Sequence, residues 1–242
     1  MAGGELSKRR ALGVVFAALA AAEAALPAAA HGYLNRAKHA FGDRAWQFFS
    51  HACGHAEGVL AWQEGRTSAS LTRLGETAER ILGTGAQPFA ALVLVDLAEL
   101  AAESGGAEAA ADAVEHLDAI GRSIQLPVYD ALALTGAAAR GDADAARRAV
   151  ELLAPSSWRA FHARALGVLG RSLVDVDRTQ ALETLQRAAV AFDSCGALWR
   201  ADRVRRTLGG LGDRGRRAAA ASRGAAALSS RERQVARLAA EA

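Results

Sequence analysis

The sequence contains few of the residues that build β-sheets. Aromatic residues make up 5% of its 242 positions, proline occurs four times, and β-branched residues are sparse, whereas alanine and leucine dominate. Aromatic and β-branched side chains favour strands, while alanine and leucine favour helices. The composition therefore argues against a sheet protein and predicts an all-α protein. Its hydrophobic content of 51% is sufficient for a core.

Cysteine and lysine are also scarce. The two cysteines, Cys53 and Cys195, lie far apart and form no disulfide framework, so we expect a reducing compartment. Neither Lys8 nor Lys38 follows a glycine, which excludes a phosphate-binding loop of the Gly-x4-Gly-Lys-Ser/Thr type. No serine stands in a Gly-x-Ser-x-Gly turn. We therefore predict no catalytic residue, no cofactor and no enzymatic activity.

The first thirty residues have two interpretations. Lys8-Arg9-Arg10, the apolar run 11–22 and Ala28-Ala29-Ala30 outline a secretory signal peptide. Glu23 interrupts the run, however, and the apolar residues have nearly helical spacing, so we favour an N-terminal helix over residues 1–26. The run is too short to span a bilayer.

From residue 27 to residue 212 the chain alternates between apolar segments and short groups of helix-ending residues. Most neighbouring breaks recur every fifteen to twenty-one residues, a spacing typical of helical hairpins. A helix of this length cannot bury its apolar stripe alone, so the hairpins must stack. We therefore predict an α-solenoid. Its predicted breaks are Glu64-Gly65, Gly83–Gly85, Ser104–Gly106, Arg140–Asp142, Ala154–Ser157, Cys195-Gly196 and Gly209–Gly215.

The best-defined hairpin spans residues 163–196, and its spacing resembles the tetratricopeptide repeat. The segment between its helices is one residue shorter than usual, and leucine replaces the usual aromatic residues. Small residues at the crossing points would allow the two helix axes to approach closely. The contact residues are Leu166, Leu169, Gly170 and Leu173 in the first helix and Ala181, Leu185 and Ala188 in the second. Weaker copies have Gly141-Asp142 at a turn followed by Ala146, Val150 and Pro155, or cover Pro88–Glu103 and Ala107–Ile120.

Positive charge is concentrated near the C-terminus. The segment from Arg200 to Arg237 contains eleven arginines and three acidic residues, a net charge of +8. The rest of the chain carries a net charge of −5. A basic tail of this kind suits a segment that approaches phosphate groups. The alternative is a solvated, arginine-rich linker and helix.

The last fifteen residues predict a short helix. Ser229 and Glu232 form a capping box, and Val235, Leu238 and Ala239 fall on one face. The segment resembles the start of the LuxR-type helix-turn-helix domain, Leu-Thr/Ser-x-Arg-Glu-x-x-Val-x-x-Leu-x-Ala-x-Gly. The matching residues are Leu228, Ser229, Arg231, Glu232, Val235, Leu238 and Ala240, and Ala242 stands where the family usually has glycine.

Residues 192–212 resemble the end of the helical domain in large LuxR-type regulators of the maltose-activator-like class. There the last repeat has a Gly-Ala turn, an aromatic-Arg pair and an arginine-rich helix that ends in Leu-Gly. Residues 27–212 would form the tetratricopeptide-like domain, residues 213–227 an Arg/Ala/Gly linker, and residues 228–242 the first helix of a truncated helix-turn-helix.

The resemblance implies a cytoplasmic, bacterial-type transcription regulator whose repeats bind a protein or small-molecule effector. The DNA-reading helix and the family's ATPase module are not in this sequence, so its DNA-binding residues are unknown. We expect weak, non-specific DNA contact at most, no membrane partner, and self-association through an uncapped solenoid end. The alternative function is a free-standing tetratricopeptide-like scaffold for protein–protein interaction without a DNA role.

A third hypothesis is an exported metal protein or an all-helical enzyme built around His51-Ala-Cys53-Gly-His55. On a helix His51 and His55 share a face, but Cys53 points largely the other way. His31 and His39 could contribute only through tertiary contacts. We therefore predict no metal site.

Several other residues are interpreted as structural. Trp46, Phe48 and Phe49 form the densest aromatic group, either in the core or in the wall of a ligand groove. Trp158 and Trp199 lie near predicted turns and are expected to anchor the packing. The tripeptide Arg140–Asp142 is explained by its place at a turn.

Overall fold

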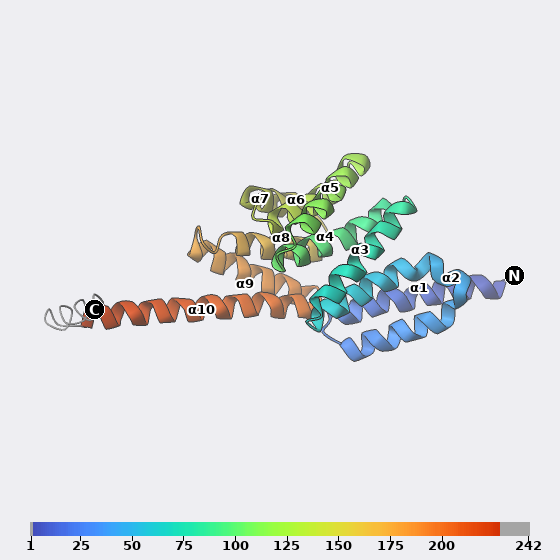
Figure 1. Cartoon of the computed structure of the whole chain (residues 1–242), viewed down its shortest axis with the longest axis horizontal. Helices are drawn as coiled ribbons and strands as arrows, with labels where there is room; N and C mark the ends of the chain where they lie inside the picture. The colour runs from blue at the N-terminus through green and yellow to red at the C-terminus, as the bar shows by residue number, and fades with distance from the viewer. Residues whose placement is uncertain (1, 228–242) are drawn as a thin grey trace. The chain divides into compact units, whose positions relative to one another are not determined.

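Every regular element in residues 2–227 is an α-helix, and this part of the chain contains no β-strand. The computed structural model describes the backbone of these residues and the side chains of residues 13–39 and 50–212. The prediction of an all-α protein is confirmed. The segment 228–242, which resembles the start of a helix-turn-helix, lies outside the described residues. The helices are α1 (Ala2–Glu23), α2 (Pro27–Gln63), α3 (Thr67–Gly83), α4 (Gln87–Glu103), α5 (Ala107–Ile124), α6 (Pro127–Ala139), α7 (Ala143–Leu153), α8 (Arg159–Ser172), α9 (Arg178–Ser194) and α10 (Leu198–Ala227) (Figure 1).

Consecutive helices pack against one another. From α1 to α9 each helix contacts the next one along the chain. Helix α6 also contacts both α4 and α8, so these three alternate helices form a continuous row. Neighbouring helices that stack in this order are what an all-α helical-repeat fold requires.

Helix α2 doubles back on itself. The side chains of Lys38 and Glu57 form an ion pair of 2.8 Å, and His31 Nε2 lies 2.9 Å from Glu64 Oε1. A straight helix would separate positions 38 and 57 by about 28 Å, at about 1.5 Å per residue. The helix therefore turns between these positions, and its two arms lie side by side (Figure 1). Trp46, Phe48 and Phe49 fall in this stretch, and their side chains lie outside the described part.

Most of the predicted breaks coincide with helix ends. Five of them contain a glycine with φ between 74° and 104°, a conformation in which other residues are strained. These glycines are Gly65, Gly85, Gly105, Gly141 and Gly196. At the fourth break Asp142 caps α7 by accepting a hydrogen bond from the amide of Ala145, 2.9 Å away.

Two features of the breaks differ from the prediction. The break expected at 209–215 does not exist, because α10 continues to Ala227 and includes the residues assigned to a linker. A glycine inside a helix lowers its stability by only about 1 kcal/mol, and no left-handed turn ends the helix here. The connection at Gln125-Leu126 was not predicted, whereas the connection at residues 173–177 lies between the two helices predicted for the hairpin 163–196.

The pairing of α8 with α9 follows the predicted contact residues. Leu166 and Gly170 of α8 are buried, as is Leu173 directly after it, whereas Leu169 is half-buried. In α9 the predicted contact residues Ala181, Leu185 and Ala188 are all buried. A Cβ atom added at Gly170 would lie 2.6 Å from Leu185 Cγ and 3.1 Å from its backbone nitrogen. The prediction that small residues occupy the crossing point is confirmed at this pair.

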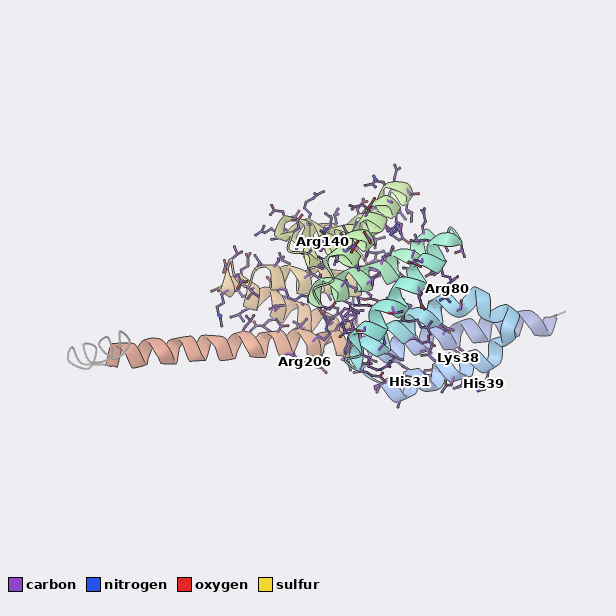
Figure 2. All side chains as sticks on the ribbon, viewed as in Figure 1. His31, Lys38, His39, Arg80, Arg140 and Arg206 are labelled. Atoms are coloured by element: carbon purple, nitrogen blue, oxygen red, sulfur yellow. The ribbon has the colours of Figure 1, made fainter. Side chains whose placement is uncertain are left out.

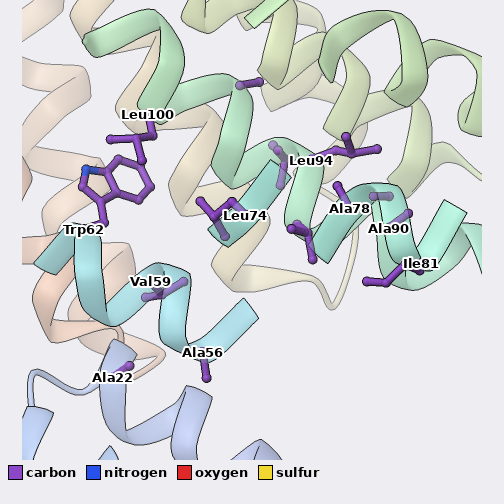
Figure 3. Packing of buried hydrophobic residues seen from close by; sticks show 14 of the residues in the cluster. Ala22, Ala56, Val59, Trp62, Leu74, Ala78, Ile81, Ala90, Leu94 and Leu100 are labelled. Atoms are coloured by element: carbon purple, nitrogen blue, oxygen red, sulfur yellow. The ribbon is translucent and has the colours of Figure 1, made fainter. Parts of the chain in front are cut away.

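The largest hydrophobic core extends from α1 to the start of α10. Figure 3 shows Ala22 of α1 near Val59 and Trp62 of α2, with Leu74 of α3 and Leu94 of α4 further along. Helix α1 also buries Val15 and Ala18, so it is part of this core. The chain divides into two units, Met1–Val204 and Arg205–Ala242. Among the helices of residues 2–227, none combines the length and the apolar character needed to cross a bilayer.

Candidate functional site

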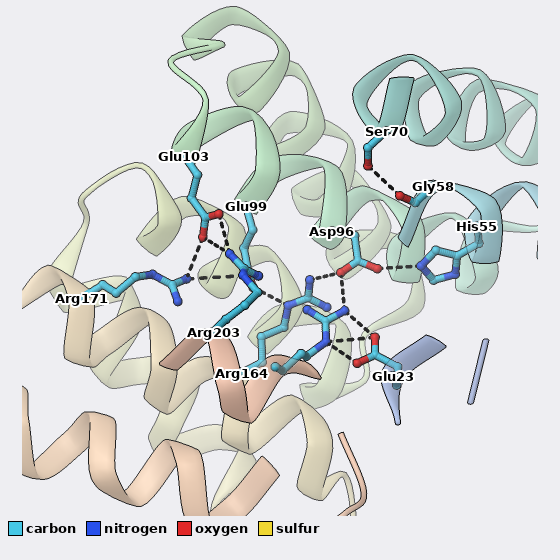
Figure 4. A network of polar contacts seen from close by, with 11 residues as sticks. Glu23, His55, Gly58, Ser70, Asp96, Glu99, Glu103, Arg164, Arg171 and Arg203 are labelled. Carbon is cyan, nitrogen blue, oxygen red and sulfur yellow. Dashed lines mark hydrogen bonds and ion pairs between the residues drawn. The ribbon is translucent and has the colours of Figure 1, made fainter. Parts of the chain in front are cut away.

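Helix α4 carries two acidic residues inside an otherwise apolar sequence. Asp96 and Glu99 stand among valine, leucine and alanine, and each is only 2% exposed. Buried carboxylates require partners, because an isolated charge in an apolar environment is strongly destabilising. Their partners come from helices distant in the sequence, and together they form the ionic network drawn in Figure 4.

Asp96 is the centre of this network. Its Oδ1 accepts hydrogen bonds from Arg164 of α8 and, at 2.8 Å, from Arg200 of α10. Its Oδ2 lies 2.6 Å from Nε2 of His55 on the second arm of α2. The single carboxylate therefore joins α2, α8 and α10 to α4 (Figure 4).

Two further carboxylates of α4 extend the network by one helical turn each. Glu99 accepts a hydrogen bond from Nε of Arg164, and it lies 3.6 Å from Arg171. Glu103 is bound by Arg203 of α10 and lies 3.8 Å from Arg171. Because the positions 96, 99 and 103 share one face of α4, the network forms a stripe along that helix.

Arg200 also reaches the N-terminal helix. Its Nε lies 2.8 Å from Glu23 Oε2, and its Nη2 lies 2.7 Å from Glu23 Oε1. Paired contacts of this kind fix the orientation of a planar guanidinium. Arg200 and Arg203 are two of the eleven arginines in the predicted basic tail, so these two are bound to carboxylates rather than available to phosphate.

Aromatic side chains enclose one end of the network. The rings of Trp62 and Trp199 meet edge to face with their centroids 5.2 Å apart. The guanidinium carbon of Arg203 lies 4.2 Å from the centroid of Trp62 and 5.2 Å from that of Trp199. The prediction that Trp199 anchors the packing is confirmed. Trp158 is 51% exposed and stacks on Phe161. It therefore does not anchor the core, and the prediction is wrong for this residue.

The network keeps its carboxylates ionised. Burial opposes ionisation of Asp96, but Arg164, Arg200 and the hydrogen bond with His55 outweigh it and hold its pKa well below the usual range. Burial also opposes ionisation of Glu99, but Arg164 and Arg171 outweigh it and lower the pKa of Glu99. For Arg200, burial favours the neutral form, but Glu23 and Asp96 raise the pKa well above its ordinary value.

The charges within the network balance. Four carboxylates, those of Glu23, Asp96, Glu99 and Glu103, face four guanidinium groups, those of Arg164, Arg171, Arg200 and Arg203. Each of these carboxylates is bound by at least one guanidinium, so none is left as a general base. The ion pairs therefore fix the positions of α1, α4, α8 and α10 relative to one another at these residues.

This ionic network was not predicted from the sequence. A signal was present, because a helix that is apolar on nearly all sides is predicted to be buried, and its acidic residues then require cationic partners. The sequence could not say which arginines supply them, since the nearest, Arg164, follows Glu99 by 65 residues.

His51, Cys53 and His55 lie on α2 but have different surroundings. His55 is bound to Asp96, while burial, followed by Glu57, raises the pKa of the fully buried Cys53 thiol to about 12. A thiol with this pKa stays protonated at neutral pH. Burial and Arg80 lower the pKa of His51. In the described part of the chain no three histidine, cysteine or acidic side chains gather in a way that could hold a metal ion.

The other two histidines of that hypothesis lie elsewhere. His31 binds Glu64, and His39 is exposed on the first arm of α2, where Figure 2 labels both side chains. Among the described residues, neither forms an ion pair or a side-chain hydrogen bond with His51 or His55. The metal-protein hypothesis therefore gains no support from tertiary contacts.

Two surface grooves are present in the described part of the chain. A groove of about 780 Å³ lies between the two arms of α2 and helix α3. Its charged residues already have partners: Lys38 and Arg73 pair with Glu57, and Arg73 also pairs with Glu76. Arg66 pairs with Glu64 outside the groove lining. A second groove of about 420 Å³ lies between α5, α6 and α7.

The fold places the chain among all-α proteins built from stacked neighbouring helices. No protein-family model matches the sequence, and a search of curated proteins finds no match.

Proposed function

We propose that the chain is the helical-repeat sensor or assembly region of a LuxR-family transcription regulator that acts in the cytoplasm. The observation that carries the proposal is the order of family features from residue 192 to residue 242. A Gly-Ala turn, an aromatic-Arg pair, an arginine-rich helix and the start of a helix-turn-helix follow one another in the sequence. Two such features in the correct order are more specific than either alone.

The structure gives these features physical roles that support the proposal. Gly196 ends α9 with a φ of 77°, and Ala197 is buried beside it. Trp199 and Arg200 then fix the first turns of α10 in the core. We propose that α10 is the element that connects the repeats to the DNA-binding segment.

The stacked hairpins α4–α5, α6–α7 and α8–α9 are proposed to be tetratricopeptide-like units of an α-solenoid. Their role would be to bind a protein or small-molecule effector. Asp96 connects this array to Arg200, so an effector that shifts α4 or α8 would act on the start of α10. The ionic network is thus the proposed route between sensing and the C-terminal segment.

DNA binding by the 242-residue chain tests this proposal. Fluorescence anisotropy with two duplexes of unrelated sequence should show weak, equal affinity that falls steeply as salt rises, since phosphate contacts without a groove-reading helix carry no sequence information. A variant with Arg214, Arg216 and Arg217 changed to glutamine should bind more weakly still. Tight binding that prefers one duplex would contradict the proposal.

The gene itself provides a second test. If the codons after Ala242 in the source DNA continue in frame into a second and third helix, the regulator is supported. An immediate stop codon would favour the free-standing scaffold. That alternative then requires a protein partner whose binding survives removal of residues 213–242.

A further inference from the structure

The groove between α5, α6 and α7 is lined by charges of both signs. Asp118 and Arg122 come from the second half of α5, Asp130 from the first turn of α6, and Arg148 from α7. Leu134 of α6 and Leu152 of α7 supply apolar surface between them. Its volume of about 420 Å³ lies in the range of small-molecule sites, about 300–1,000 Å³.

The four charged side chains have no protein partners among the described residues. In the described residues, none of them takes part in an ion pair or a side-chain hydrogen bond. This distinguishes the groove from the larger one beside α3, where Glu57 already binds two cations. A ligand would have to break ion pairs in the larger groove, whereas here it would displace only the water around four exposed charges.

Local structure holds two of these charges in place. Arg122 lies in the last turn of α5 and Asp130 in the first turn of α6, and each charge has the sign that its helix end stabilises. Gly121 makes room for the Asp130 carboxylate, because a Cβ atom there would lie 2.9 Å from its Oδ1. The charged lining is therefore set by the packing of α5 against α6.

The chemistry of this lining selects the ligand. Two guanidinium groups fit a carboxylate, which they bind through forked hydrogen bonds, and two carboxylates fit an ammonium group. Because the site has no net charge, it favours a ligand that carries both. The two leucines favour an aliphatic group beside them. We propose that the groove binds a small zwitterion with an aliphatic side group, the chemistry of a free aliphatic amino acid.

This inference goes beyond the proposed function and does not depend on it. Such a ligand would be an effector for the proposed sensor region, but binding requires only the groove. Tight, sequence-selective DNA binding would contradict the proposed function but not the ligand site. Absence of ligand binding would contradict the ligand site but not the proposed function.

Titration calorimetry on the 242-residue chain tests the proposal with three probes. L-Leucine carries both charges, L-leucinamide lacks the carboxylate, and N-acetyl-L-leucine lacks the ammonium group. We expect leucine to bind and each analogue to bind at least about tenfold more weakly, the effect of about one lost charge-assisted contact. No heat of binding from leucine up to about 10 mM, or equal binding of an analogue, would overturn the proposal.

Variants locate the site. Arg148→Gln and Asp130→Asn should each weaken leucine binding by about tenfold or more, since each removes one charge that the ligand contacts. The matched control is Arg147→Gln, the next residue on α7, which pairs with Asp144 outside the groove. It should bind leucine as the parent does. Circular dichroism checks that all three variants fold, and binding that is unchanged in folded Arg148→Gln and Asp130→Asn would reject this groove as the site.

Discussion

Glu23 and Arg200 lie 177 positions apart in the sequence and form a two-pronged ion pair, with Arg200 Nη2 2.7 Å from Glu23 Oε1 and Arg200 Nε 2.8 Å from Glu23 Oε2. The same guanidinium donates to Asp96 at 2.8 Å. The first residues of α10 are thus fixed against α1 and α4 at once. This relationship makes the core of the first unit depend on charges as well as on apolar contacts.

Removing the central carboxylate should destabilise the fold. In Asp96→Asn the neutral amide no longer balances Arg164 and Arg200, and loss of one partner of a buried ion pair costs about 3–5 kcal/mol. Urea denaturation followed by circular dichroism measures the change. Asp112→Asn, on the exposed face of α5, is the control and should stay within about 0.5 kcal/mol of the parent. Equal stability of the two variants would show that the network contributes little.

Stability should fall in acid because of the same carboxylates. The pKa of Asp96 is lower in the folded protein than in the unfolded chain, where aspartate titrates near about 3.9. Its stabilising contribution is therefore present above about pH 4 and is lost as the pH falls toward the folded pKa. Glu99 acts in the same direction. Urea midpoints measured across this range should drop steeply in the parent and less steeply in Asp96→Asn.

The close approach of α8 and α9 should not tolerate a methyl group. In Gly170→Ala the new Cβ would lie 2.6 Å from Leu185 Cγ, and overpacking of this kind typically costs about 1–3 kcal/mol. Gly75→Ala in α3 is the matched control, since no atom lies within 4 Å of its added Cβ. It should raise stability by about 0.4–1 kcal/mol. Thermal unfolding measures the stability of both variants against the parent. A Gly170→Ala variant more stable than the parent would contradict the observed packing.

The two cysteines should differ in reactivity. Burial, with a contribution from Glu57, raises the pKa of Cys53 to about 12, and its side chain is inaccessible, whereas Cys195 is exposed at the end of α9. Alkylation by iodoacetamide requires an accessible thiolate. Intact mass should therefore show one adduct per folded chain, mapped to Cys195, and two in urea. Modification of Cys53 in the folded chain would show that the core around it opens.

Local sequence signals predicted most of the helices. Glycines such as Gly85 and Gly141 end helices because only glycine adopts their backbone angles without strain. The periodic positions of Leu166, Leu185 and their neighbours predicted which faces are buried. Both kinds of signal depend on residues within a few positions of one another, so the sequence contains them directly.

Features that depend on distant residues were not predicted. The turn within α2 brings Lys38 beside Glu57, and no local signal marked it. The charged lining of the α5–α7 groove was also missed, because Arg122 and Arg148 meet there only after the hairpins stack.

The sequence by itself determined an all-α protein, most of its helix boundaries and the small residues at one helix crossing, because backbone preference and apolar periodicity are local properties. Tertiary structure alone decided that Asp96 binds His55, Arg164 and Arg200. A buried carboxylate must find cations, but which cations it finds depends on how the helices stack, and that is set by the packing of the whole first unit.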